Sequence, residues 1–184
     1  MNRFWNIAAG FAVALLVSHP ACAAVDGVGE SGFALTETVH VAAPPARVYA
    51  AFVTPSQWWS PVHSYSHDAA NFTMEPRAGG CWCEKLPDGG SVQHLTVAMV
   101  MPGKAIRLLG ALGPFQAWGA SGAMTVTFKA AADGGTDLVA TYNMGGYSKD
   151  GFAGGAKAAD AVLGDNLARL KTFIETGSPD TKGK

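Results

Sequence analysis

Apolar and polar residues alternate along most of the chain, in segments separated by short turns. Residues 33–42 (FALTETVHVA) show the period of two that is typical of a half-buried strand. Six more segments of this kind follow, at 72–76, 80–86, 91–101, 105–111, 122–130 and 136–143. The turns between the later segments are short and rich in glycine, as in PDGG at 87–90. Short turns join antiparallel neighbours, so the pattern predicts an antiparallel meander.

Other segments have the helical period instead. Residues 46–53 (ARVYAAFV) follow Pro45, which suits a first helical turn, and residues 55–59 (PSQWW) predict a second short helix. Residues 156–177 (AKAADAVLGDNLARLKTFIETG) predict a long amphipathic helix that ends at Gly177. Its apolar stripe is made of Ala159, Leu163, Leu167, Leu170 and Ile174, with Val162 and Phe173 beside it.

The order of these elements is one strand, two short helices, six strands and a long helix. This order predicts an α+β domain in which a curved antiparallel sheet of about seven strands is covered on one face by the C-terminal helix. A helix that lies across a curved sheet leaves a space between the two. We therefore expect a ligand cavity there.

The N-terminal residues have the layout of a secretory signal peptide over 1–24. Arg3 precedes an apolar run at 7–17, and Pro20 and the small residues 21–24 follow. The apolar run is shorter than the roughly 20 residues that a membrane-spanning helix needs. We expect cleavage after residue 23 or 24, no transmembrane segment afterwards, and a periplasmic or secreted location.

The remaining chain divides into three parts. Residues 25–32 are rich in glycine and are expected to be a flexible leader, residues 33–177 form the domain, and residues 178–184 are expected to be a disordered tail. A lipid anchor on Cys22 is a weaker alternative to cleavage, because His19 and Pro20 stand where apolar residues usually precede such a cysteine.

Charge is low and evenly balanced. The chain has 13 Lys and Arg against 14 Asp and Glu, a net charge of −1, and loss of Arg3 would leave −2. Nucleic acid is not an expected partner, because phosphate binding needs clustered basic residues. Neither a glycine-rich nucleotide motif nor a Gly-x-Ser-x-Gly elbow is present in the sequence, and we expect no cofactor.

Residues 81–94 (CWCEKLPDGGSVQH) leave three interpretations open. If residues 88 and 89 form a two-residue turn, Cys83 faces His94, and both cysteines and His94 lie on the outer face of the sheet. A zinc site would use these three ligands, although no fourth is near and the cysteine spacing is unusual. A Cys81–Cys83 disulfide would span about 6.5–7 Å along one strand, at the far limit for a bridge.

The third interpretation, a hairpin with free thiols and no metal, is the one we favour. In that hairpin Trp82 and Glu84 point to the inner face. The assignment of faces depends on a regular register, since a single bulge would reverse it.

Aromatic residues in two loops and one strand suggest the walls of the cavity. Trp59 and His63 are expected at its mouth, Phe115 and Trp118 as a lid, and Tyr142 as a residue that orients a ligand through its hydroxyl. The alternative is structural: the tryptophans cap the core, the histidines are solvated, and the lid is a hydrophobic plug.

Glu84 is the candidate for acid–base chemistry. It is expected to point inward beside Trp82, to share ligand contact with it, and to have a raised pKa because of burial. His63 or Tyr142 would complete an acid–base pair. The alternative, which we favour, is a structural partner such as Arg107 or Gln93, or a place at the open end of the cavity.

Five stretches of the chain resemble a known superfamily. They are VHVAAPPARVYAAFVTPSQWWSP, EPRAGGCWCEKLPDGG, VAMVMPGKAIRL, GGTDLVATY and LARLKTFIETG. Together they are similar to the SRPBCC (START/Bet v 1-like) superfamily, in the branch of the activator of Hsp90 ATPase homologue 1, over residues 33–177. The resemblance implies a helix-grip fold with an apolar cavity.

The superfamily includes lipid carriers, aromatic polyketide cyclases and dehydratases, hormone-binding proteins and co-chaperone domains, so the fold alone does not assign a function. We expect an exported protein that binds or carries a small hydrophobic or aromatic ligand. The alternative is a cyclase or dehydratase acting on such a ligand. Hsp90 is not an expected partner, because it is cytosolic.

Overall fold

The alternating segments assemble into one antiparallel sheet. The computed structural model describes residues 22–180. The predicted signal peptide therefore lies outside the described residues up to residue 21, as does the predicted disordered tail from residue 181 onward. The strands are β1 (Cys22–Gly29), β2 (Gly32–Val41), β3 (Phe72–Met74), β4 (Cys81–Lys85), β5 (Ser91–Met101), β6 (Ala105–Gly110), β7 (Gly119–Ala130) and β8 (Thr136–Tyr147). Their order across the sheet is β1-β2-β8-β7-β6-β5-β4-β3.

The helical segments lie between β2 and β3 and after β8. They are α1 (Pro45–Phe52) and α2 (Ala153–Thr176), with short 3₁₀ turns η1 (Pro55–Gln57), η2 (Pro61–His63), η3 (Ala69–Asn71), η4 (Pro87–Gly89) and η5 (Gly113–Ala117). Helix α2 ends as predicted, because Gly177 adopts a left-handed conformation (φ 83°) and its N–H bonds to the carbonyl of Phe173. None of the helices within residues 22–180 is long and apolar enough to span a bilayer.

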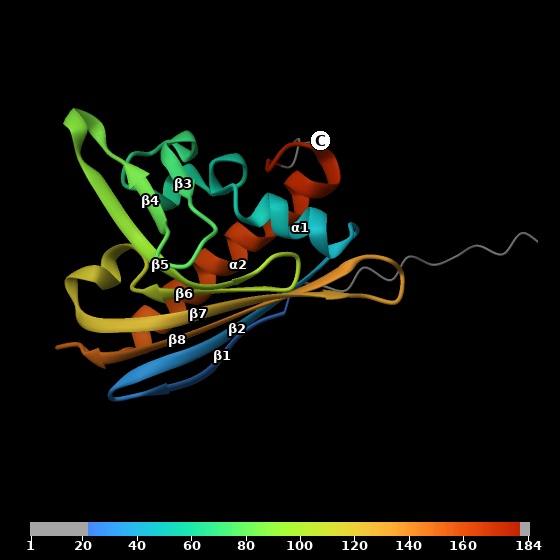
Figure 1. Ribbon diagram of the computed structural model, residues 1–184. Coiled ribbons are helices and arrows are strands. Elements are labelled where there is room, and N and C mark those ends of the chain that lie inside the picture. The colour runs from blue at the N-terminus through green and yellow to red at the C-terminus, as the bar shows by residue number, and fades with distance from the viewer. Residues whose placement is uncertain (1–21, 181–184) are drawn as a thin grey trace, which may run out of the picture.

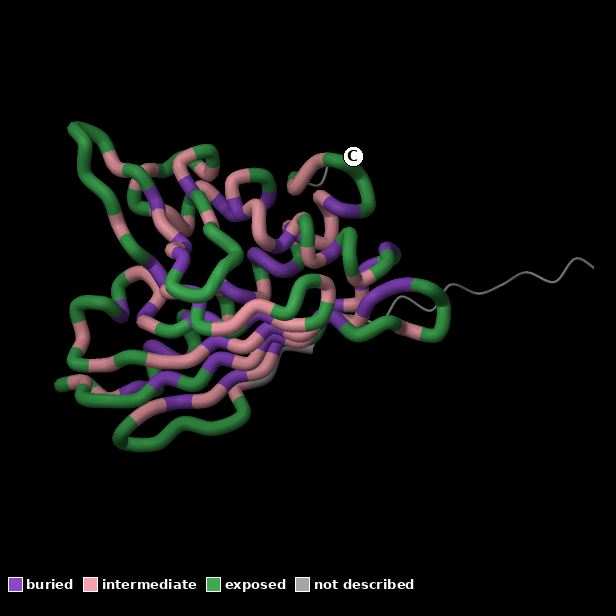
Figure 2. Tube along the Cα trace, viewed as in Figure 1, coloured by how far each residue is buried: buried purple, intermediate pink, exposed green. Residues whose placement is uncertain are grey.

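The sheet curves around α2, which lies in its concave face (Figure 1). Leu163, Leu167 and Leu170 of the predicted stripe are buried against the sheet. Buried positions alternate with partly buried ones along most of β2 and β8, and the buried segments of the strands and of α2 meet in the middle of the molecule (Figure 2). The α+β helix-grip architecture is confirmed.

The number of strands is eight rather than about seven, because β1 occupies residues 25–29 of the expected flexible leader together with residues 22–24 at the end of the predicted signal peptide. β1 pairs with β2 in an antiparallel hairpin that closes through residues 30 and 31, with Val28 opposite Phe33 and an irregularity between Val25 and Gly27. Its glycine-rich sequence has no alternation to signal a strand. The pairing instead depends on backbone groups, which cover the otherwise open edge of β2.

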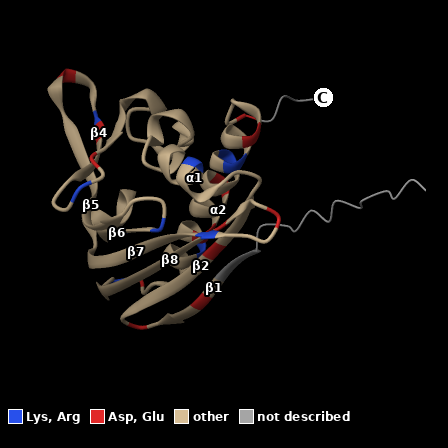
Figure 3. Cartoon of the chain, turned by 45° about the vertical axis from the view of Figure 1, so that its right-hand side comes forward, with Lys and Arg blue, Asp and Glu red and all other residues tan. Residues whose placement is uncertain are grey.

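An aromatic cluster fills the core between α1, η1 and β4. Trp58 stacks on Phe52 at 5.7 Å between ring centroids, and Trp82 meets Trp59 edge-on at 5.1 Å. All four side chains are at least 96 % buried. Charged residues of both signs are scattered over turns, strands and helices in the view of Figure 3.

Candidate functional site

A cavity of about 420 Å³ lies between the loop after η1, the segment 112–118 and the first half of α2. We call residues 112–118 the lid segment. The cavity is lined by Trp59, Val62, His63, Ser64, Tyr65, His94, Leu112, Gly113, Pro114, Phe115, Trp118, Tyr142, Gly154, Gly155, Ala158, Ala159, Val162 and Leu163. No Asp, Glu, Lys or Arg is among these residues, so the wall carries no carboxylate, ammonium or guanidinium group.

The cavity has an exposed rim and a buried floor. Val62 and Tyr65 at the rim are 75 % and 47 % exposed, whereas His94 and Tyr142 are 4 % and 1 % exposed. The cavity therefore opens to solvent at Val62 and Tyr65 and is closed at its floor by His94 and Tyr142.

Small residues of α2 make room for the cavity. A Cβ added to Gly155 would lie 2.7 Å from the Trp118 ring and 3.0 Å from the Phe115 ring, so only glycine fits between the helix and the lid segment. A Cβ added to Gly154, by contrast, would have no neighbouring atom within 4 Å. Sequence reasoning missed this helical contribution, although the small residues at the start of the helix were a visible signal.

Five of the seven predicted ligand-contact residues line the cavity: Trp59, His63, Phe115, Trp118 and Tyr142. Phe115 and Trp118 pack edge-to-face at 5.0 Å between ring centroids and form one wall. That these residues contact a ligand stays a prediction.

Tyr142 does not present a free hydroxyl to the cavity. Its oxygen accepts a hydrogen bond from Leu112 N–H at 3.1 Å and donates to the carbonyl of Gly110 at 3.5 Å. Burial raises the pKa of Tyr142 to about 12, so the hydroxyl stays protonated. The hydroxyl therefore anchors the lid segment through Leu112, and its use to orient a ligand stays a prediction.

Trp82 is not part of the cavity wall. It is 1 % exposed and packs on Trp59 from behind, within the aromatic core. The expectation that it contacts a ligand is therefore not supported by its position, and its effect on the cavity is to hold Trp59 in place.

His94 lies on the inner face of the sheet, contrary to the regular hairpin register. Cys81 pairs with Thr96 and Trp82 with Leu95 as expected, but Cys83 pairs with Gln93. The extra residue on β5 is a bulge, and it leaves His94 and Leu95 both buried although they are adjacent in sequence. Nearer the turn, Glu84 pairs with Val92 and Lys85 with Ser91, so the turn through η4 is longer than a two-residue hairpin.

Glu84 points inward, as the alternation predicts, and its partner is His94. His94 Nε2 lies 2.9 Å from Glu84 Oε2, and the carboxylate also accepts hydrogen bonds from the N–H groups of Tyr65 (3.2 Å) and Ser66 (2.6 Å). The expected partners Arg107 and Gln93 are engaged elsewhere, with Thr125 and Thr96. Glu84 does not line the cavity itself, but it holds two residues that do, His94 and Tyr65.

The prediction that burial raises the pKa of Glu84 is wrong. Burial by itself raises it, but the hydrogen bonds from Ser66, His94 and Tyr65 together outweigh burial and lower the pKa of Glu84. Burial lowers the pKa of His94, and the neighbouring carboxylate opposes that effect only in part. Near neutral pH the pair is therefore an ionised carboxylate beside a neutral imidazole.

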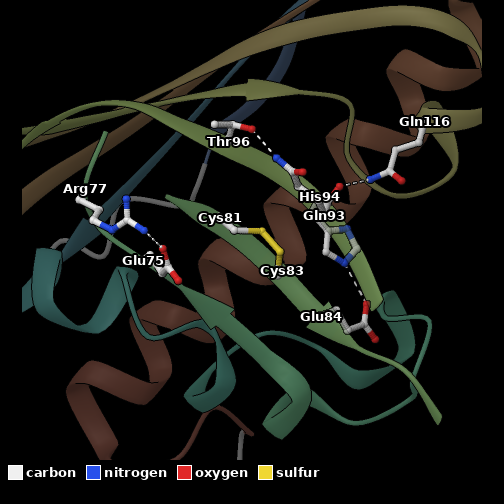
Figure 4. Close-up of a disulfide and its surroundings, with 9 residues drawn as sticks. All are labelled: Glu75, Arg77, Cys81, Cys83, Glu84, Gln93, His94, Thr96 and Gln116. Carbon is white, nitrogen blue, oxygen red and sulfur yellow. Dashed lines mark hydrogen bonds and ion pairs between the residues drawn. A yellow bond between two sulfur atoms is a disulfide. The ribbon is translucent and has the colours of Figure 1, made fainter. Parts of the chain in front are cut away.

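Two aromatic rings stack on the His94 imidazole. Phe72 lies at 5.2 Å and Tyr65 at 6.0 Å between ring centroids, with interplanar angles of 26° and 24°. Figure 4 shows Nε2 directed at Glu84 and the second ring nitrogen directed away from that carboxylate. The stacked rings and the carboxylate fix the orientation of the imidazole.

Cys81 and Cys83 form a disulfide on the outer face of β4, so the favoured interpretation of free thiols is wrong (Figure 4). Their Cα atoms are 5.4 Å apart, closer than in a regular strand, and the register irregularity begins at the same place. The bond uses both thiols, so they are not zinc ligands. Within residues 22–180 no three His, Cys, Asp or Glu side chains form a group suited to a metal ion.

A pair of carboxyl groups, the buried Glu37 and the half-buried Asp160, lies between β2 and α2, away from the cavity lining. Glu37 is 1 % exposed, and burial, followed by the nearby Asp160 carboxyl, raises its pKa from 4.5 to about 7. Glu37 Oε1 and Asp160 Oδ1 are buried without a hydrogen-bond donor among the described residues. A proton held between the two carboxyls would satisfy both oxygens.

Comparison with protein families shows which family the chain belongs to. Residues 42–175, well over half of the sequence, match the family described as Activator of Hsp90 ATPase homolog 1-like protein. The chain belongs to this family. Among curated proteins, none matches it.

Solved structures of the same fold come from several sources. A conserved protein of unknown function from Enterococcus faecalis is 16 % identical with a TM-score of 0.60, and the match covers 88 % of this chain and 79 % of that one. An uncharacterised protein from Rhizobium leguminosarum is 23 % identical with a TM-score of 0.58, over 85 % and 99 %. DynU16, a putative protein in the dynemicin biosynthetic locus, is 18 % identical with a TM-score of 0.54, over 79 % and 48 %. At these identities the matches establish the fold.

Proposed function

We propose that the protein binds and carries a small apolar or aromatic molecule in the cavity between the lid segment and α2. The observation that carries this proposal is a hollow of about 420 Å³ whose lining includes aromatic rings and no charged side chain. Known ligand pockets run from about 300 to 1,000 Å³, so this cavity suits a molecule of about two fused rings rather than a large lipid.

Export is part of the proposal. The sequence of residues 1–24 supports it, and the Cys81–Cys83 bond adds support because disulfides persist in oxidising compartments and are rare in the cytosol. An exported protein would not meet cytosolic Hsp90, so the activity in the family's name is not extended to this chain. Fractionation of the producing cells, with the N-terminal residue read by mass spectrometry, tests export separately from binding.

Binding is tested first by a native mass spectrum of the freshly purified protein. An organic mass that is lost on denaturation would support a carrier and would begin to identify its ligand. A titration with the neutral fluorescent probe N-phenyl-1-naphthylamine then tests the position of the site. Val162→Phe fills the cavity and should weaken probe binding at least tenfold, whereas Ala161→Phe, on the exposed side of α2, should not. Equal binding by both variants would place the probe elsewhere.

A second candidate function is catalysis on the bound molecule, of the cyclase or dehydratase type. The observation that favours it is the Glu84–His94 pair, because a buried carboxylate that orients an imidazole at a cavity wall is a common arrangement for general acid–base chemistry. Glu84→Gln distinguishes the two functions. A carrier should keep its ligand with modest change, whereas an enzyme should lose turnover of its substrate and keep binding it.

A further inference from the structure

Polar atoms at the cavity wall are few, and most of them are already engaged. Ser64 Oγ donates to the carbonyl of Pro61 at 2.8 Å, and Trp59 Nε1 donates to the carbonyl of His63 at 2.9 Å. The Tyr142 hydroxyl is held by the lid segment, as described above. His63 lies at the rim with its Nε2 3.6 Å from Asp165. The Tyr65 hydroxyl and the Trp118 indole N–H belong to exposed and half-buried side chains, whereas His94 is the other polar side chain that lies deep in the wall.

The protonation of His94 follows from its partner. A carboxylate only accepts hydrogen bonds, and the Glu84 carboxylate already takes two from backbone N–H groups, so the His94 Nε2 that faces it must carry a hydrogen. Burial lowers the pKa of His94, which keeps the ring neutral near pH 7. Nδ1 then has a lone pair, and no donor to it is found among the described residues.

We propose that Nδ1 of His94 is the recognition point for a ligand hydroxyl, so that the cavity selects neutral aromatic molecules that donate one hydrogen bond, such as phenols and naphthols. This inference rests on the proposed binding function and narrows it. The ring system of the ligand packs against the aromatic and small apolar wall. Its O–H donates to Nδ1, while Glu84 fixes the imidazole through Nε2.

The same geometry disfavours charged ligands. A carboxylate at this place would face the Nδ1 lone pair, and the lining has no Lys or Arg to balance it. A cationic ligand would find no Asp or Glu in the lining. Burying an unpaired charge costs far more than one hydrogen bond returns, so both classes should bind weakly.

The test compares molecules of nearly the same size and shape. Calorimetric titrations of the full protein with 2-naphthol, 2-methoxynaphthalene and 2-naphthoate at pH 7.5 measure the three affinities. The first two compounds differ in the hydroxyl hydrogen, and the third adds a negative charge. A net contribution of about 1–1.5 kcal/mol for one hydrogen bond predicts that 2-naphthol binds about 5- to 12-fold more tightly than the methyl ether. 2-Naphthoate should bind more weakly than both.

The possible outcomes separate this inference from the proposed function. Equal affinity for 2-naphthol and its methyl ether would overturn the hydroxyl inference and leave the apolar binding function standing. Preference for 2-naphthoate would overturn it as well. Failure of all three compounds to bind would overturn both the inference and the proposed function for aromatic ligands.

A variant and a spectroscopic signal locate the effect at His94. His94→Phe keeps a ring between Phe72 and Tyr65 and should reduce the preference for 2-naphthol over its methyl ether to about one. His67→Asn, at an exposed position outside the cavity lining, is the matched control and should keep the preference. Should His94→Phe not fold, ¹⁵N spectra of the unmodified protein decide: 2-naphthol should shift the Nδ1 resonance of His94, and the methyl ether should not. No shift with bound 2-naphthol would refute the contact.

Discussion

Glu37 provides a direct test of the structure, because replacing its buried carboxyl should stabilise the protein at alkaline pH. The side chain is 1 % exposed and faces the Asp160 carboxyl across the interface between β2 and α2. Glu37→Gln keeps the shape of the side chain, cannot ionise, and gives Asp160 an amide N–H to accept. The variant should therefore remove a destabilising charge without leaving a cavity.

The magnitude follows from the pKa. Burial first, and then Asp160, raise the pKa of Glu37 from 4.5 to about 7, so the folded state favours the protonated carboxyl. The corresponding stability is fully present below pH 4.5 and is lost as the pH rises through about 7. At about 1.4 kcal/mol per pH unit the loss reaches on the order of 3 kcal/mol. Glu37→Gln avoids this loss, so above pH 8 its melting temperature should exceed that of the native protein by roughly 5–10 °C.

The assay is urea unfolding followed by tryptophan fluorescence, repeated from pH 4 to pH 9. The gap in the free energy of unfolding between Glu37→Gln and the native protein should be small near pH 4.5 and should widen up to pH 8. Asp160→Asn should also reduce the pH dependence, because its amide donates to the Glu37 carboxylate. Glu30→Gln, in the exposed turn between β1 and β2, is the control and should follow the native curve. A gap that stays constant with pH would refute the buried carboxyl pair.

Three further predictions concern the lid, the disulfide and the buried ion pair. Gly155→Ala should destabilise the protein by about 1–3 kcal/mol, because the added Cβ would overpack against the lid segment. Gly154→Ala has open space and should be neutral or stabilise the protein by up to about 1 kcal/mol. Thermal melts of the two variants measure the difference, and equal melting temperatures would contradict the close contact at Gly155. Without reductant, the tryptic peptide that contains Cys81 and Cys83 should have the mass of the dithiol less two hydrogens. Cys83→Ser should lower the free energy of unfolding by about 1.5 kcal/mol, because the disulfide closes a very short loop. Alkylation of both thiols in the native protein would argue against the bond. Glu84→Ala should lower the free energy of unfolding by about 3 kcal/mol at pH 7, because it leaves two backbone N–H groups and an imidazole N–H without an acceptor. This difference should shrink as the pH falls through the lowered pKa of Glu84. An equal difference at pH 3 and pH 7 in urea titrations would disprove the role of the carboxylate charge.

Much of the fold was readable from local periodicity. The stripe from Ala159 to Ile174 and the stop at Gly177 depend on neighbours within one or two helical turns, and both are in the structure as predicted. The strands from β2 to β8 were predicted because each has one buried face, which imposes a period of two. The same alternation placed Glu84 on the inner face.

The partners of these side chains were not readable in the same way. β1 carries no side-chain signal, and its place is decided by the free edge of β2. His94 was assigned to the wrong face because it is the extra, unpaired residue of a bulge in β5, and a bulge is a property of the paired strands rather than of either sequence. The Cys81–Cys83 bond depended on the same local distortion of β4.

By itself, the sequence determined the helix-grip class, the inward carboxylate and five aromatic or histidine residues of the cavity wall, because each depends on spacing along the chain. Only the tertiary structure decided that Glu84 forms a hydrogen bond with His94 and that Tyr142 holds the lid segment. It also decided that the glycine and alanine residues of α2 leave space for the cavity between the helix and the lid segment. Those facts depend on which atoms from distant segments come within hydrogen-bond or van der Waals distance. Such distances are set by the packing of the whole sheet against α2.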